Sequence, residues 1–66
     1  MEKFHETLKM LRKKKGLTQQ KLAEILGIKQ NSYSDWETGN NEPSLENLIK
    51  LADLLEVSLD WLFGRE

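Results

Sequence analysis

The chain contains no cysteine, only one histidine and only one proline among its 66 residues. The lack of cysteine excludes a disulfide framework, and a lone histidine, His5, predicts no structural metal site. There is no Ser/His/Asp or Cys/His set and no phosphate-cradling glycine loop, so we expect neither an enzyme nor a cofactor. Stability must then come from the packing of a small apolar core.

Long apolar runs are also missing. No segment approaches the length that spans a bilayer, and the amino terminus lacks the charged-then-apolar order of a signal peptide. We therefore expect a cytoplasmic protein that does not engage a membrane. The chain is expected to form a single domain, 1–66, without repeats or linkers. Its last residue, Glu66, fits a natural end and the cut end of a longer protein equally well.

The chain has little net charge, −1, but its charges are segregated. Residues 1–15 carry six basic and two acidic side chains, whereas residues 31–66 carry two basic and eight acidic ones. Attraction to a polyanion must therefore come from a local basic patch and from helix N-termini. Lys13 to Lys15 close the first expected helix, where they either stabilise the helix dipole or contact phosphate.

The sequence does contain two short amphipathic helices separated by a glycine, in the run LTQQKLAEILGIKQNSYSDWE. Thr18 is suited to cap a helix over about 18–26. Gly27 is suited to end it, because a residue without Cβ readily adopts positive φ. A second helix follows over about 29–37, with polar residues at its exposed start. This spacing is typical of a helix-turn-helix.

Helical periodicity continues on both sides of this pair. A first helix is predicted from about residue 3 to 14, and Ser44 and Ser58 are expected to cap a fourth helix and a short fifth one. Tyr33 and Trp36 lie three residues apart on the inner side of the third helix, where we expect core packing. The predicted fold class is all-α, a compact five-helix domain whose second and third helices form the helix-turn-helix.

A set of residues distributed along nearly the whole chain resembles a known family. The set is Leu17-Thr18-Gln19, Leu22-Ala23, Gly27, Trp36-Glu37, Gly39 and Pro43-Ser44. It resembles the Xre or Cro-type family of phage-repressor-like helix-turn-helix regulators. The resemblance implies a repressor-like fold that binds double-stranded DNA. It also implies an ion pair between Arg12 and Glu37, joining the first helix to the end of the third.

Candidate DNA contacts lie at the starts of the two motif helices. Gln30 and Asn31 open the expected recognition helix, and their amides suit the N6 and N7 edge of adenine; helix capping is the alternative. Gln19 opens the preceding helix, where free backbone amides suit a phosphate. The resemblance implies that this glutamine anchors the motif to the DNA backbone, with a base contact as an additional role. Further phosphate contacts are expected from Thr18, Lys29, Ser32, Asn40 and Asn41.

Some positions depart from the resembled family. Asp35 stands where relatives often carry a long basic or amide side chain, so it either accepts from cytosine N4 or stays out of the interface. The loop at Asn40, Asn41 and Glu42 lacks the lysine or arginine that is frequent there, which predicts modest affinity per monomer. Glu56 occupies a turn that favours positive φ, so it either accepts backbone strain or forms a different turn.

Bulky apolar residues gather near the carboxyl end. Leu62 is expected to face the core, and Trp61 or Phe63 to stay partly exposed, which is typical of a partner surface. The alternative is that both aromatic rings fold onto the core. We expect a homodimer interface formed by Leu55, Leu59, Trp61 and Phe63.

These features together predict a sequence-specific transcriptional regulator, a repressor that binds a twofold-symmetric DNA operator as a homodimer. The alternative function is that of a protein-binding module with the same fold, such as an anti-repressor or an antitoxin partner. The near-neutral net charge and Asp35 favour this alternative.

Overall fold

The computed structural model describes residues 3–65, which form five α-helices. The helices are α1 Phe4–Lys14, α2 Gln19–Leu26, α3 Gln30–Thr38, α4 Leu45–Leu55 and α5 Leu59–Leu62. No strand occurs in this part of the chain, so the predicted all-α fold class is confirmed. The predicted bounds agree to within a residue, and α3 begins and ends one residue later than expected. Glu66, and with it the nature of the chain end, lies outside the described residues.

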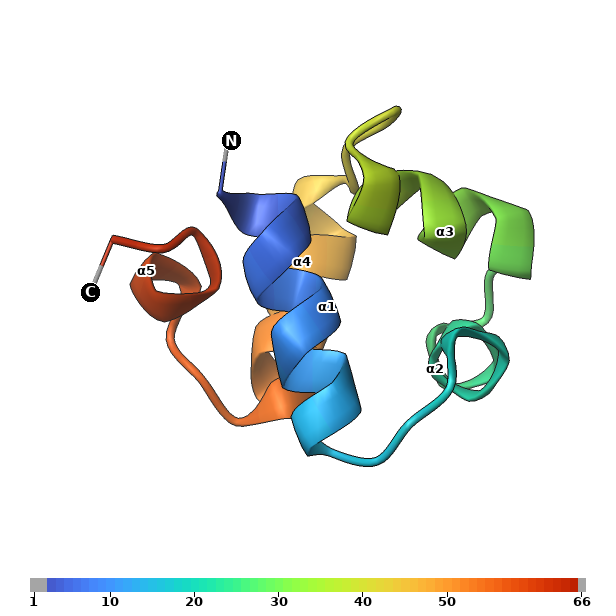
Figure 1. Cartoon of the computed structure of the whole chain (residues 1–66), viewed down its shortest axis with the longest axis horizontal. Helices are drawn as coiled ribbons and strands as arrows, with labels where there is room; N and C mark the ends of the chain where they lie inside the picture. Colours follow the sequence, from blue (N-terminus) through green and yellow to red (C-terminus); the bar gives the residue numbers. More distant parts are fainter. Residues whose placement is uncertain (1–2, 66) are drawn as a thin grey trace.

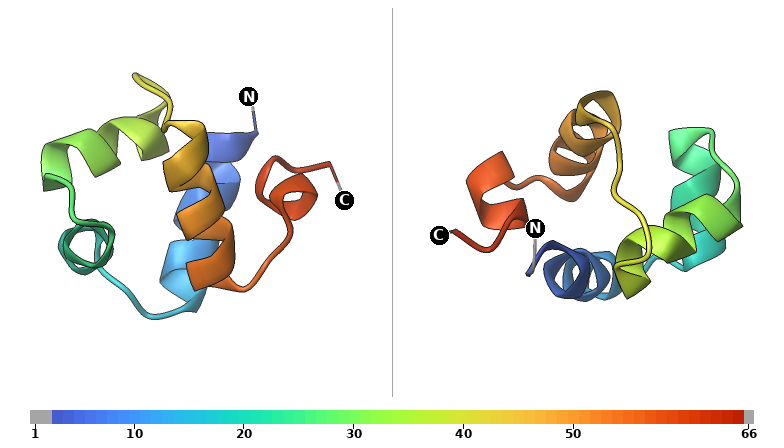
Figure 2. Two further views of the ribbon diagram at one scale, coloured as in Figure 1. Left: turned by 180° about the vertical axis from the view of Figure 1, so that it is seen from behind. Right: turned by 90° about the horizontal axis from the view of Figure 1, so that it is seen from above.

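The helices are arranged around α1 and α4, which occupy the middle of the molecule (Figure 1). All views place α2 and α3 together on one side of this pair and α5 on the opposite side (Figure 2). α3 packs against both α1 and α2, whereas α5 packs against α1 and α4. The helix-turn-helix and the carboxyl-terminal helix therefore occupy opposite ends of a molecule 28 Å long.

Side-chain caps start three of the helices as the sequence predicts. Thr18 Oγ1 accepts the backbone N–H of Lys21 at 3.0 Å, and Ser44 and Ser58 cap α4 and α5 in the same way. Gly27 ends α2 with φ of 73°, a left-handed conformation that lets Ile28 turn back and donate its N–H to the carbonyl of Ala23. Local sequence thus sets where α2 begins and ends and where α4 and α5 begin.

The core is built from apolar side chains of every helix. Tyr33 and Trp36 are buried, and their rings meet edge to face with centroids 5.6 Å apart. Phe4 packs against Phe63, with ring centroids 6.2 Å apart, and this contact fastens α5 to α1. Core packing of Tyr33 and Trp36 was expected from the sequence. The remaining fully buried large side chains are Leu8, Leu22, Leu51 and Leu62.

Glu56 is the one described residue other than glycine with positive φ, at 60°. It ends α4 in the left-handed conformation. Of the two outcomes considered from the sequence, backbone strain or a different turn, the structure therefore has the strained turn. Its carboxylate lies 2.8 Å from Lys15 Nζ at the end of α1. The hydrogen bond from Lys15 lowers the pKa of Glu56. Because both side chains are solvent-exposed, this ion pair contributes little to stability.

We expect the Glu56→Gly variant to unfold at a higher temperature than Glu56→Ala, by about 4–8 °C. Both substitutions remove the ion pair with Lys15, but glycine alone also relieves the left-handed strain. Thermal unfolding followed by circular dichroism measures the difference. Equal midpoints for the two variants would show that the conformation of this turn carries no steric cost.

Candidate nucleic-acid interface

A buried carboxylate near the end of α3 binds side chains from three helices. Glu37 Oε2 lies 2.6 Å from Arg12 Nε and also accepts a hydrogen bond from the Tyr33 hydroxyl, while Oε1 accepts one from Arg12 Nη2 at 3.2 Å. Gln19 Nε2 donates to the same Oε1 at 3.0 Å. Arg12 Nη1 in turn donates to the carbonyl of Leu17 at 2.7 Å. This Glu37 cluster thus connects α1, the entry to α2, and α3.

The pKa shifts in the Glu37 cluster all favour an ionised Glu37 with protonated partners. Burial by itself raises the pKa of Glu37, but hydrogen bonds from Arg12, Tyr33 and Gln19 lower it below its ordinary value. Burial and the bond to Glu37 raise the pKa of Tyr33, and the bond to Glu37 raises that of Arg12. At neutral pH each donor therefore keeps its proton and Glu37 is ionised. Among residues 3–65 no buried side-chain polar atom lacks a partner.

The sequence indicated only part of this cluster. The resemblance implied the pair of Arg12 and Glu37, and the structure places these two side chains in contact. The tyrosine hydroxyl was missed, although Tyr33 and Glu37 are four residues apart on one helix, a spacing that brings side chains together. Gln19 was expected to point toward DNA, and no local pattern indicates that its amide turns inward.

The start of α3 is polar and open to solvent. Lys29, Gln30, Asn31 and Ser32 are all exposed. No side chain caps this helix, so the capping role considered for Gln30 and Asn31 is not found. Within the described chain these two amides make no hydrogen bond, which leaves their donors and acceptors available.

The other expected contact residues border the same motif. The exposed Thr18 hydroxyl is already the acceptor for the Lys21 N–H. Asn40 and Asn41 are exposed, and their backbone N–H groups donate to the carbonyl of Asp35 at 3.0 and 3.3 Å. The Asp35 side chain is half-buried. The loop after α3 is therefore anchored to the end of that helix by main-chain bonds, which leave the Asn40 amide exposed.

The four residues expected at a dimer interface differ in how far they are exposed. Trp61 is 38% exposed, whereas Leu55 is 3% exposed and offers a partner almost no area. Leu59 and Phe63 are half-buried, and Phe63 contacts Phe4. Leu62 faces the core, as predicted. Of the two aromatic rings near the carboxyl end, Trp61 is the more exposed.

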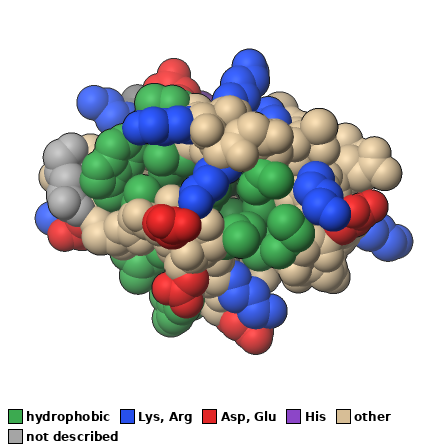
Figure 3. Space-filling model, turned by 90° about the horizontal axis from the view of Figure 1, so that it is seen from below, with side chains coloured by type: hydrophobic (Ala, Val, Ile, Leu, Met, Phe, Trp, Pro, Cys, Tyr) green, Lys and Arg blue, Asp and Glu red, His purple; other side chains and the backbone are tan. Residues whose placement is uncertain are grey.

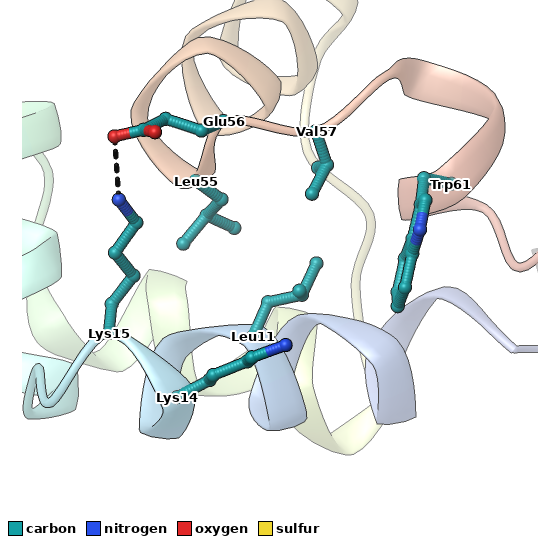
Figure 4. A pocket seen from close by; sticks show the side chains of 7 residues that line it. All are labelled: Leu11, Lys14, Lys15, Leu55, Glu56, Val57 and Trp61. Carbon is teal, nitrogen blue, oxygen red and sulfur yellow. Dashed lines mark hydrogen bonds and ion pairs between the residues drawn. The ribbon is translucent and has the colours of Figure 1, made fainter.

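Trp61 borders a groove between α1 and the turn that precedes α5. The groove has a volume of ≈ 410 Å³ and is lined by Leu11, Lys14, Lys15, Leu55, Glu56, Val57 and Trp61. Figure 4 shows the indole at one end, the ion pair of Lys15 and Glu56 at the other, and Leu11 and Val57 between them. From below, the molecule presents apolar patches bordered by charged side chains (Figure 3).

Comparison with known proteins settles the family. Residues 8–62 match the family described as helix-turn-helix. The chain belongs to the helix-turn-helix family. It is 46% identical over 63 residues to the uncharacterized HTH-type transcriptional regulator YqaE of Bacillus subtilis, covering 96% of this chain and 54% of that one. The predicted membership of the Xre or Cro-type group is confirmed.

Two further relatives have a similar sequence identity to this chain over a similar length. The cryptic phage CTXphi transcriptional repressor RstR of Vibrio cholerae is 44% identical over 63 residues, 96% of this chain and 56% of RstR. The HTH-type transcriptional regulator AnsR of Bacillus subtilis is 46% identical over 61 residues, 92% of this chain and 53% of AnsR. The chain spans about half the length of these relatives. The family and these relatives are transcriptional regulators and not enzymes.

Two further properties of the described residues concern membrane-spanning helices and groups of metal-binding side chains. None of the helices within residues 3–65 is long and apolar enough to cross a bilayer. The same residues contain no cluster of three histidine, cysteine or acidic side chains that is able to hold a metal ion.

The Glu37 cluster predicts a specific loss of stability in acid. The pKa of Glu37 is lower in the folded chain than the ordinary 4.5. The contribution of ionised Glu37 to the free energy of unfolding is therefore complete above pH 4.5 and is lost as the pH falls through the folded-state pKa. We expect Glu37→Gln to have a lower thermal midpoint than the natural chain at pH 7, and the gap to narrow below pH 4.5. A gap independent of pH between 7 and 3 would contradict an ionised Glu37.

Proposed function

We propose that this chain is a sequence-specific regulator that binds a twofold-symmetric operator in double-stranded DNA as a homodimer, with α3 in the major groove. The observation that supports this most directly is the start of α3. There, Gln30 and Asn31 stand exposed with unpartnered amides on a helix that the Glu37 cluster holds in place. An exposed helix N-terminus of this kind is how a helix-turn-helix reads base edges.

The proposed base contacts follow from the chemistry of the amide group. Gln30 and Asn31 each offer a donor beside an acceptor, which matches the N7 and N6 edge of adenine. Asp35 lies further along α3 and is half-buried. A carboxylate accepts only, so if Asp35 reaches a base it pairs with the N4 amino group of cytosine.

Phosphate contacts are proposed for the groups that flank these bases. The first backbone N–H groups of a helix have no intrahelical acceptor. Thr18 takes the N–H of Lys21, and the N–H groups of Gln19 and Gln20 remain for a phosphate, where the helix dipole favours negative charge. The side-chain donors proposed for neighbouring phosphates are Thr18, Lys29, Ser32, Asn40 and Asn41.

Repression is proposed as the mode of regulation because a relative that shares nearly the whole length of this chain is named a phage repressor. A protein bound at an operator can block access to the DNA beneath it without further chemistry. Such a role places the protein in the cytoplasm.

The dimer is proposed to form at the end of the molecule opposite α3. Figures 1 and 2 place α5 away from α2 and α3, and Trp61 lies beside a groove that has both apolar and charged lining residues. Two chains of 28 Å meeting at this end are long enough to set their recognition helices about 34 Å apart, one turn of DNA. We propose Trp61, Leu59 and the exposed part of Phe63 as the interface, without Leu55, which is buried.

Replacing Gln30 or Asn31 by alanine should weaken specific DNA binding by about 1–3 kcal/mol each and relax preference at one base pair. Thermal stability should change little, because both side chains are exposed and neither makes a hydrogen bond within the described chain. Selection of bound sequences from random duplex DNA, followed by titration of the preferred site, measures both effects. Asp53→Ala, an exposed change on α4, is the control that should leave binding intact. Wild-type preference in both variants would refute the assignment of α3.

The competing function, a protein-binding module, draws on the acidic carboxyl-terminal half of the chain. The dependence of binding on salt separates the two functions. Operator binding releases counterions from phosphate, so its affinity should fall steeply between 50 and 200 mM salt, by orders of magnitude. A failure to enrich any DNA sequence at low salt would favour the protein-binding module.

Trp61→Gln should shift the chain toward monomer in sedimentation and weaken operator binding while preserving the helical signal. The reason is that Trp61 combines large area with exposure, whereas Phe63 also supports Phe4. Leu45→Gln is the matched control, because Leu45 is a still more exposed apolar side chain at the start of α4. Equal sedimentation of the Trp61 variant and the natural chain would exclude this interface and leave the proposed DNA-binding motif untouched.

A further inference from the structure

An exposed ring and a hollow lie side by side near the carboxyl end of the chain. Trp61 is 38% exposed and stands at one end of the groove described above, which has a volume of ≈ 410 Å³. Cavities of about 300–1,000 Å³ hold small-molecule ligands, so the groove has room for one indole ring. Between its ends lie the apolar side chains of Leu11 and Val57 (Figure 4). The ring therefore borders a hollow that is able to receive another such ring.

Unpaired charges of opposite sign accompany the ring and the groove. Lys14 lines the groove, and Figure 4 shows its side chain extending from α1 toward the end where Trp61 lies. Lys15 Nζ lies 2.8 Å from Glu56, whereas the Lys14 side chain makes no ion pair within residues 3–65. Asp60 directly precedes Trp61 on α5 and is exposed, and its carboxylate also has no partner in that range. One copy of the chain thus leaves both charges unmatched.

Twofold symmetry matches all four of these features at once. In a twofold interface the same patch of both copies meets, so every contact between two different residues occurs twice. A ring and a hollow on one patch are then filled reciprocally, and a base and an acid are paired reciprocally. Aromatic side chains that fill pockets supply much of the energy of an interface. Exposed ion pairs add little energy and mainly select the partner and its orientation.

We propose that the groove receives the Trp61 ring of a second copy of this chain and that Lys14 pairs with Asp60 of that copy. This inference rests on the proposed homodimer. It adds the surface at the end of α1 that receives the interface residues of α5. Each copy supplies one ring and one groove, so the contact closes on a dimer and leaves neither feature free to bind a third chain.

Charge reversal in two separate chains tests whether Lys14 and Asp60 meet across the interface. Lys14→Glu and Asp60→Lys each place like charges at both pairs of the dimer. In sedimentation at low salt, each variant should dimerise about tenfold more weakly than the natural chain. An equimolar mixture of the two variants should regain dimers, because both pairs of the mixed dimer join opposite charges. A change in the fold of one chain does not produce this recovery.

Lys13→Glu is the matched control for the reversal on α1. Lys13 is also an exposed lysine in the last turn of α1, so its reversal opposes the helix dipole in the same way, but it does not line the groove. This variant should dimerise almost as the natural chain does. Circular dichroism checks that every variant is folded. The effects of Lys14→Glu and Asp60→Lys should shrink at high salt, because exposed charges are screened.

Neutral substitutions cover the case in which a lysine at position 60 disrupts α5. Lys14→Gln and Asp60→Asn each remove both ion pairs of the dimer, so each should weaken dimerisation about two- to tenfold. The double variant should be no weaker than either single variant, because the pairs are already lost. Losses that add in the double variant, or dimerisation that neither single variant weakens, would overturn the pairing.

The two levels of the hypothesis fail in distinguishable ways. If the natural chain stays monomeric at every concentration, the proposed homodimer itself is wrong. If the natural chain dimerises but the folded, charge-reversed variants do not recover dimers when mixed, the second copy binds elsewhere. In that case only the role of the groove is wrong, and the proposed dimer and DNA binding are unaffected.

Discussion

The arrangement of the first three helices depends on one carboxylate. Glu37 is 7% exposed and accepts hydrogen bonds from Arg12 on α1, Gln19 on α2 and Tyr33 on its own helix. A buried charge is costly unless every lone pair is satisfied, and removing one partner of a buried pair is far more damaging than the pair is stabilising. The cluster therefore acts mainly as a constraint that admits one orientation of α2 and α3 relative to α1.

That constraint matters because the two ends of the molecule have different proposed tasks. α2 and α3 carry the polar groups proposed to contact DNA, and α5 carries the exposed indole proposed to contact a second copy. With few basic side chains near α3, one chain alone is expected to bind weakly. A dimer makes the second half-site engagement intramolecular and raises affinity without new contacts. The core between the two ends must be rigid for the spacing of the recognition helices to be defined.

Much of this architecture could be predicted from local pattern. Helix caps and turns depend on neighbours only a few residues away, as at the hydroxyl caps Thr18, Ser44 and Ser58 and at Gly27 with its positive φ. The predicted helix bounds therefore agree with the observed ones to within a residue. The burial of Tyr33 and Trp36 followed from their spacing on one face of a helix. The exposure of Gln30 and Asn31 was predicted from the same helical period, because the face of an amphipathic helix opposite its buried side is in contact with solvent.

By itself, then, the sequence determined the fold class, the order of the helices and the family, since periodicity, caps and turn residues act over short distances. The tertiary structure decided what depends on approach between distant segments. It turned the amide of Gln19 toward Glu37, 18 residues away, packed Phe63 on Phe4, and buried Leu55 while leaving Trp61 exposed. It also held Glu56 in a left-handed turn beside Lys15. No local pattern specifies which way a glutamine amide faces or which of several apolar side chains stays uncovered, because both depend on the helices that pack around it.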